Sequence, residues 1–203
     1  MNMRTSVFWL NVIVAGMLCL PLLHSCKSKG VSAPAVDEVS AEDQAVEDPV
    51  LAAVDKYLVD EIGSRYSPGE VCIPCSVIMD VKDSDDGETL VSGSFWVFNY
   101  VRSGDTLKTV SGGHHPGIMH VRTYGDDFKV ASFDAVGDGS DYLPSARRLF
   151  GDRFDAFQEL VSDDLRREAV RSAAVTDYVR RNKLPVTMYQ DFGWDPVRIG
   201  DPE

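Results

Sequence analysis

The stretch of residues 89–102 constrains the fold more than any other part of the sequence. Its side chains alternate in direction and both of its faces are apolar, so either both faces are covered or one of them lines a cavity or a partner site. One face would carry Phe95, Val97 and Val101, and the other Trp96, Phe98 and Tyr100. Shorter alternating stretches lie at 75–82, 106–111, 118–123 and 128–136, separated by polar turns such as "SGD" and "YGDD". This pattern predicts an antiparallel meander of four or five strands.

Helical patterns flank these strands on both sides in the sequence. Asp48 is suited to cap a helix and Pro49 to begin it, and apolar residues then recur at helical spacing until Gly63. Residues 143–183 are mainly helical in pattern. A helix, a meander and further helices predict an α+β domain with helices on one face of the sheet. The order resembles cystatin-like and NTF2-like folds, which implies a curved sheet wrapped around the N-terminal helix.

The N-terminal residues have the pattern of an exported chain. A positive charge at Arg4 precedes an apolar run at residues 7–23, and this order is typical of a secretory signal peptide. The alternative is a membrane-spanning helix, which needs about 20 apolar residues. The run is shorter than that and is interrupted by Asn11 and Pro21, so the signal peptide is favoured.

The run Leu23-His24-Ser25-Cys26 resembles the lipobox of bacterial lipoproteins, with His24 in place of the usual small residue. The resemblance implies cleavage before Cys26 and acylation of that cysteine. Lipid would then anchor the chain to a bacterial membrane. The implied compartment is the cell envelope, with the outer membrane favoured over the inner membrane.

Composition divides the chain into three parts: a signal peptide at residues 1–25, a lipidated cysteine with a flexible acidic tether at residues 26–48, and one globular domain at residues 49–203. The chain has 32 acidic and 20 basic residues and a net charge of -12. This balance argues against nucleic acid as a partner and against the domain itself lying on an anionic membrane. The expected partners are the membrane, through the lipid, and a protein, peptide or small ligand.

Cys72 and Cys75 form a C-x-x-C pair, a spacing used in redox chemistry, metal sites and local disulfides. The residues after the pair alternate like a strand, whereas a redox pair opens a helix, and a zinc ribbon needs a second cysteine pair. If the chain turns at Pro74, the two thiols can bridge. If it is extended, their Cα atoms lie about 10 Å apart, beyond the roughly 7 Å limit for a disulfide. A local disulfide and two unconnected thiols both remain open.

The histidines of the exported part gather in "GGHHPGIMH". His114 and His115 would point in opposite directions in a strand, so the better metal-binding pair is His115 with His120. A cysteine would be the third ligand. Imidazole and thiolate ligands suit zinc or copper. The alternative is a glycine-rich connection with imidazoles on the surface. No cofactor is expected, since no P-loop, dinucleotide-binding fingerprint or nucleophile elbow occurs.

Residues 138–150 resemble a short pattern found in extracytoplasmic domains of BlaR1-type sensor-transducer proteins. The matching residues are Asp138, Gly139, Ser140, Tyr142, Ser145 and Phe150. The resemblance implies no catalytic role. Physically, the stretch would end a strand, turn on glycine and begin a short helix.

These patterns together favour a non-catalytic envelope lipoprotein that binds a protein, peptide or small ligand on its sheet. The expected binding surface comprises Trp96, Phe98, Tyr100 and Trp194. Exposed aromatic residues can anchor a partner, although Trp194 could instead fold back onto the core. The alternatives are a thiol oxidoreductase that uses Cys72 and Cys75 and a metal-binding protein that uses His115 and His120.

Overall fold

The computed structural model describes residues 48–200, so the predicted signal peptide, the lipidated cysteine and the tether up to residue 47 lie outside the described residues. The described part belongs to one compact unit, Gln44–Glu203. Its helices are α1 (Pro49–Tyr57), η1 (Leu58–Ile62), η2 (Gly63–Arg65), η3 (Gly139–Asp141), α2 (Tyr142–Phe150), η4 (Gly151–Arg153), α3 (Phe154–Ser162) and α4 (Asp164–Arg181). Its strands are β1 (Val71–Asp83), β2 (Thr89–Ser103), β3 (Thr106–Tyr124), β4 (Asp127–Ala135), β5 (Met188–Gln190) and β6 (Val197–Arg198). None of these helices is both long and apolar enough to cross a membrane.

The predicted α+β class is confirmed, but the sheet is mixed and has six strands. Strands β1 to β4 pair antiparallel in sequence order, whereas β5 pairs parallel with β3 and antiparallel with β6. The prediction of four or five purely antiparallel strands was therefore wrong. Strands β5 and β6 have three and two residues, too few for an alternating pattern. Long-range bonds hold β5 instead, because the N–H groups of Thr187 and Met188 donate to the carbonyl of Asp105.

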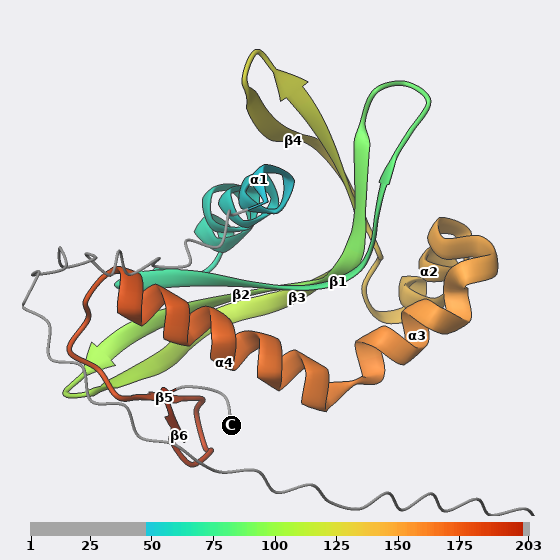
Figure 1. Ribbon diagram of the computed structural model, residues 1–203. Coiled ribbons are helices and arrows are strands. Elements are labelled where there is room, and N and C mark those ends of the chain that lie inside the picture. Colours follow the sequence, from blue (N-terminus) through green and yellow to red (C-terminus); the bar gives the residue numbers. More distant parts are fainter. Residues whose placement is uncertain (1–47, 201–203) are drawn as a thin grey trace, which may run out of the picture. The chain divides into compact units, whose positions relative to one another are not determined.

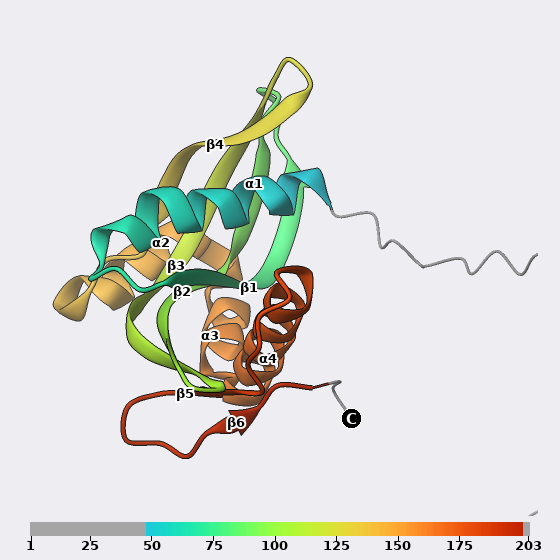
Figure 2. The same ribbon diagram turned by 90° about the vertical axis from the view of Figure 1, so that its left-hand side faces the viewer.

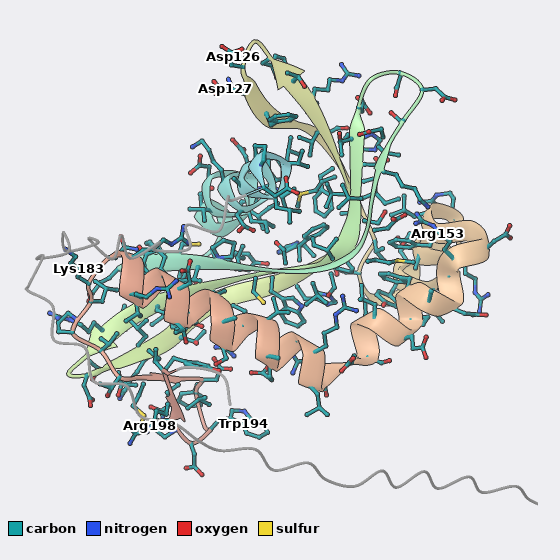
Figure 3. The ribbon with its side chains drawn as sticks, viewed as in Figure 1. Asp126, Asp127, Arg153, Lys183, Trp194 and Arg198 are labelled. Atoms are coloured by element: carbon teal, nitrogen blue, oxygen red, sulfur yellow. The ribbon has the colours of Figure 1, made fainter. Side chains whose placement is uncertain are left out.

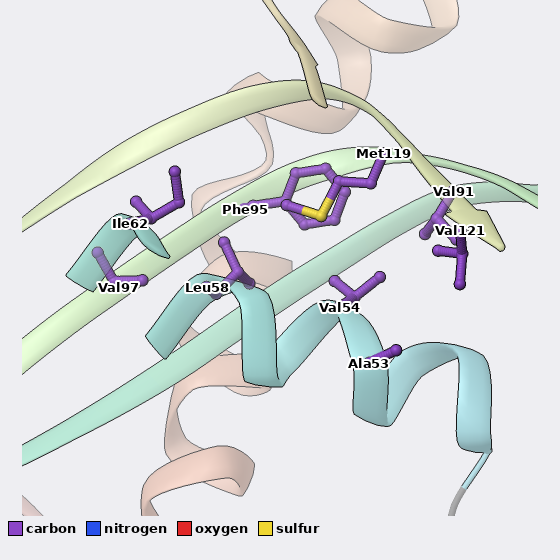
Figure 4. Close-up of a cluster of buried hydrophobic side chains, with 9 residues drawn as sticks. All are labelled: Ala53, Val54, Leu58, Ile62, Val91, Phe95, Val97, Met119 and Val121. Carbon is purple, nitrogen blue, oxygen red and sulfur yellow. The ribbon is translucent and has the colours of Figure 1, made fainter. Parts of the chain in front are cut away.

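Helix α1 begins where its sequence dictates. The Asp48 carboxylate accepts hydrogen bonds from the N–H groups of Val50 and Leu51 at 2.9 and 3.4 Å, and Pro49 occupies the first helical position. The helix continues into the π-helical η1, and together they bury one apolar face against the sheet (Figure 4). This first core consists of Ala53, Val54, Leu58, Ile62, Val91, Phe95, Val97, Met119 and Val121.

Helices α2, α3 and α4 cover the opposite face of the sheet from α1 (Figure 1). A second core lies under α4 and consists of Ile73, Tyr100, Leu107, Val175, Val179, Val186 and Tyr189. A third, made of Val136, Ala146, Phe150, Phe154 and Phe157, joins α2 and α3. The expectation of helices on one face was therefore wrong. Strand β2 is apolar on both faces because helices cover both of them.

Candidate functional site

A buried arginine organises the surface between α4 and the C-terminal strands. Arg171 of α4 is only 3% exposed. Its guanidinium donates to both carboxylate oxygens of Asp191 at 2.6 Å, to the Tyr100 hydroxyl at 3.0 and 3.1 Å, and to the Thr109 hydroxyl at 3.2 Å. It also lies 3.9 Å from the centre of the Phe98 ring. The cluster therefore ties the residue after β5 to α4, β2 and β3.

The charges of this cluster are strongly coupled. Burial lowers the pKa of Arg171, but the hydrogen bonds to Asp191 and the neighbouring Tyr100 outweigh it and raise the pKa overall. The bond from Arg171 holds the pKa of Asp191 below its usual value. Burial raises the pKa of Tyr100 to about 12. At neutral pH the cluster therefore contains a cation, an anion and a neutral phenol, which is a structural rather than a proton-transfer arrangement.

The connection from β5 to β6, residues 191–195, is here called the aromatic loop. Its side chains Phe192 and Trp194 are 97% and 75% exposed. The loop is nevertheless ordered by hydrogen bonds, because the Trp194 N–H donates to the Asp191 carbonyl at 3.1 Å and the Gln190 amide donates to the Trp194 carbonyl at 2.8 Å. Gly193 supplies the positive φ of 80° that this turn requires. Figure 3 shows Trp194 beyond α4, at the end of the domain formed by β5 and β6.

Two hollows adjoin the aromatic loop. One, of about 490 Å³, is lined by Arg167, Glu168, Arg171, Tyr189, Asp191, Trp194, Asp195 and Val197. The other, of about 400 Å³, is lined by Val101, Lys108, Thr109, Val110, Gln190, Asp191, Phe192 and Gly193. Trp194 borders the first and Phe192 the second, so both exposed rings stand beside concave surface.

The predicted aromatic surface is divided by the fold. Tyr100 is fully buried, and Phe98 lies beneath Arg171. Trp96 stacks on His114 with ring centres 4.1 Å apart and has Arg167 over its ring at 5.4 Å. Only Trp194 of the four predicted residues is largely open to solvent. Phe192, its equally exposed neighbour, was not in the predicted set, although "DFGWDP" presents both rings around one glycine.

The two cysteines are free thiols in strand β1. Cys72 is paired in register with Asn99 and Cys75 with Trp96, so β1 is extended through Pro74. Because they are three residues apart in a strand, their side chains point to opposite faces. The local disulfide is therefore not formed, and the structure has the alternative of two unconnected thiols. Burial raises the pKa of Cys72 and raises that of Cys75 to about 12, which disfavours the nucleophilic thiolate.

The three histidines do not converge. The His114 ring nitrogen Nε2 lies 2.8 Å from the Ser94 hydroxyl, and His115 Nε2 lies 2.7 Å from the Tyr66 hydroxyl. His120 instead lies between Glu88 and Asp134, at 2.6 and 3.1 Å. His115 and His120 thus bind separate partners, and residues 48–200 hold no cluster of three or more possible metal ligands from His, Cys, Asp and Glu.

His114 should make stability depend on pH below neutrality. Burial lowers its pKa from 6.5 to about 4, so the unfolded chain takes up the proton first as the pH falls. Stability is then lost between pH 6.5 and pH 4, by about 2 kcal/mol after allowing for partial solvent exposure. We expect the free energy of unfolding, measured by urea titration at several pH values, to fall less steeply between pH 6.5 and pH 4 in His114→Gln than in the wild type. An equal pH dependence of stability in the two proteins would show that His114 does not cause the loss.

A charged network that no sequence motif predicted joins the residue before β2, Glu88, to β3 and β4. Glu88, only 6% exposed, accepts hydrogen bonds from Arg122 at 2.5 Å and lies 2.6 Å from His120. The bond to His120, followed by those from Arg122, lowers the pKa of Glu88 despite its desolvation. Burial lowers the pKa of His120, but its bonds to Glu88 and Asp134 outweigh burial and raise it overall.

The network predicts a pH effect opposite in sign to that of His114. Since the folded pKa of His120 is raised above 6.5, its stabilising charge is fully present below pH 6.5 and is lost as the pH rises through the folded value. We expect His120→Gln to be less stable than the wild type at pH 6, with the difference shrinking by pH 8.5 in urea titrations. A difference that grows with pH would contradict this account.

Residues 138–150 make contacts that hold the turn after β4 and the start of α2 in place. The Ser145 hydroxyl donates to the Asp141 carbonyl at 2.6 Å and accepts from the Gly137 N–H at 2.8 Å. Phe150 stacks on Phe157 with ring centres 4.0 Å apart. These contacts fix the turn after β4 and dock α2 on α3.

Compared with known proteins, this chain matches no family model, no curated protein and no solved structure.

Proposed function

We propose that this chain is a non-catalytic lipoprotein of the bacterial cell envelope whose folded domain binds a protein or peptide through the aromatic loop. The observation that carries the proposal is the exposure of Phe192 and Trp194, 97% and 75%, on a loop that is ordered by its own hydrogen bonds and by the buried Arg171–Asp191 pair. Tryptophan is among the residue types that most often dominate binding energy at protein interfaces, and a pre-organised backbone lowers the entropic cost of binding.

The anchoring part of the proposal rests on sequence. The lipobox-like run ending in Cys26 and the acidic tether after it favour attachment to a membrane by lipid, with the outer membrane favoured. The tether would hold the domain away from the surface, which suits a module that meets a soluble or envelope-bound partner. The net charge of -12 makes nucleic acid an unfavourable partner.

The fold part of the proposal is a cystatin-like or NTF2-like arrangement, in which a curved antiparallel meander, β1 to β4, wraps α1. The packing of Val54 and Leu58 against Phe95 in the first core supports it. Such folds carry many unrelated functions, so the binding assignment depends on the aromatic loop and not on the architecture.

Photo-crosslinking tests the proposed binding surface. The full chain would be expressed with p-benzoyl-phenylalanine in place of Trp194 and, in a matched control, in place of Leu165, which is 86% exposed at the start of α4. We expect discrete crosslinked adducts to envelope proteins from position 194 and none of the same adducts from position 165. Identical adducts from both positions, or none from position 194, would remove the proposed surface.

A further inference from the structure

Strand β3 has an unpaired edge between two neighbours. On the side away from β2, β5 pairs with Thr106, Leu107 and Lys108, and β4 pairs with β3 only from Gly117 onward. Residues 109–116, here called the β3 gap, have no strand partner on that side. At about 3.3 Å per residue the gap is about 26 Å long. Figure 2 shows this part of β3 with β4 above it and β5 below it.

The register of β3 determines which backbone groups face the gap. The Pro116 carbonyl points away from β2, since it accepts a hydrogen bond from the N–H of Val136 at 2.8 Å. Alternate residues of a strand direct their backbone groups to the same side, and the pairing of β2 with residues 111–121 of β3 contains no register shift. The N–H and C=O groups of Gly112 and His114 therefore face the gap. Within residues 48–200 no hydrogen bond engages these groups.

A side-chain hollow lies at one end of the β3 gap. It is the 400 Å³ hollow beside Phe192, and Val110, 46% exposed, forms part of its wall. Unpaired backbone groups next to a partly apolar hollow are the two parts of a strand-addition site, where main-chain bonds supply affinity and a side-chain pocket supplies selectivity.

We propose that the β3 gap binds an extended peptide segment of a partner protein, which adds a strand between β4 and β5 and inserts an apolar side chain between Val110 and Phe192. The outward groups of Gly112 and His114 need complementary C=O and N–H groups about 6.7 Å apart, a repeat that an extended backbone supplies. The inference rests on the proposed function and names the class of partner for it.

The geometry and charge favour this occupant over two others. A second copy would present the same recessed edge, so its own β4 and β5 would meet those of the first copy before the two β3 edges could pair. The acidic tether before the capping residue Asp48 carries five carboxylates, at Asp37, Glu38, Glu42, Asp43 and Glu47. These would add like charge near Asp138, whose charge acts on His115 in β3, and near Asp191 in the wall of the hollow, against one opposite charge in that wall, Lys108. A neutral or basic segment from another protein avoids both conflicts.

Peptide binding and amide exchange test the inference with the full chain in detergent. The probe is a pool of capped hexapeptides that alternate Thr with Val, Leu, Phe or Tyr, together with the same pool N-methylated on alternate residues. We expect the amides of Gly112 and His114 to exchange freely alone and at least tenfold more slowly with the pool. The N-methylated pool should bind at least tenfold more weakly. Val110→Lys should weaken binding at least tenfold, and the matched control Val81→Lys, on β1, less than twofold.

Three results would overturn the inference: no enrichment from the pool, equal binding by the N-methylated pool, or protection of both amides in the peptide-free chain, as occupation by the tether or a second copy would cause. Its failure is separable from failure of the proposed function. If a partner crosslinked through position 194 binds while the peptide results fail, strand addition is wrong and the proposed function stands. If peptides bind but position 194 crosslinks nothing, the aromatic loop loses its role.

Discussion

Replacing Arg171 by methionine is expected to lower the free energy of unfolding by about 3 kcal/mol. The change leaves the buried Tyr100 hydroxyl without its two guanidinium donors and removes both bonds to Asp191. The expected loss lies at the low end for breaking a buried ion pair, because the Asp191 side chain is 38% exposed and water can hydrate its carboxylate once Arg171 is gone. Chemical denaturation at pH 7 measures the effect.

Arg167→Met is the matched control for this change. Arg167 lies one turn earlier on α4, but its ion pairs with Asp164 and Glu168 are on the surface, where such pairs contribute between 0 and about 1 kcal/mol. Amide exchange in residues 191–194 should accelerate in Arg171→Met and not in Arg167→Met, because of the two arginines only Arg171 donates hydrogen bonds to Asp191 of the aromatic loop. If the two variants unfold at the same denaturant concentration, the buried cluster is not the anchor described here.

The parts of the fold that depend on local patterns could be predicted from the sequence. The capping carboxylate of Asp48 and the apolar spacing after it predict α1 where it begins, and alternation with tight turns predicts β1, β2 and β4. The stretches at 106–111 and 118–123 were expected as two strands, but the structure has one strand, β3, which runs straight through the glycine-rich segment between them. Strands β5 and β6 could not be found in this way, because the bonds from Thr187 and Met188 to Asp105 join residues more than 80 positions apart. The two apolar faces of β2 were consistent either with cover on both faces or with a cavity or partner site on one of them. The sequence could not show that α4 covers the second face.

The candidate site was only partly accessible to sequence reasoning. Trp194 stood out as an aromatic residue near glycine, but Trp96, Phe98 and Tyr100 have their surroundings set by α4, which is distant in the sequence. Arg171 carried a signal that could have been used. It precedes Val175 and Val179 by four and eight residues, so it falls on the apolar face of α4, where a buried cation requires a partner.

The histidine and cysteine hypotheses depended on geometry that the sequence does not contain. The partners of His115 and His120, Tyr66 and Glu88, lie 49 and 32 residues away. Cys72 and Cys75 could bridge only if the chain turned at Pro74, and pairing of β1 with β2 keeps it extended. A short motif therefore indicates what chemistry is available, and the surrounding strands decide whether its residues meet.

The second large effect concerns binding. Removing both rings of the aromatic loop, Phe192→Ala with Trp194→Ala, should cost at least about 2 kcal/mol of binding free energy, the threshold for dominant interface residues, or about 30-fold in affinity. Stability should change by less than about 0.5 kcal/mol, since both side chains are largely exposed and α4 does not depend on them. Leu165→Ala removes an equally exposed apolar side chain outside the loop and should change affinity less than twofold.

The affinity of the double variant for the partner crosslinked at position 194 is the most direct test of the account. Calorimetry would compare the dissociation constants of the double variant, the wild type and Leu165→Ala. We expect the dissociation constant to rise at least about 30-fold in the double variant alone. An unchanged dissociation constant in a folded double variant would contradict the claim that the aromatic loop is the binding surface.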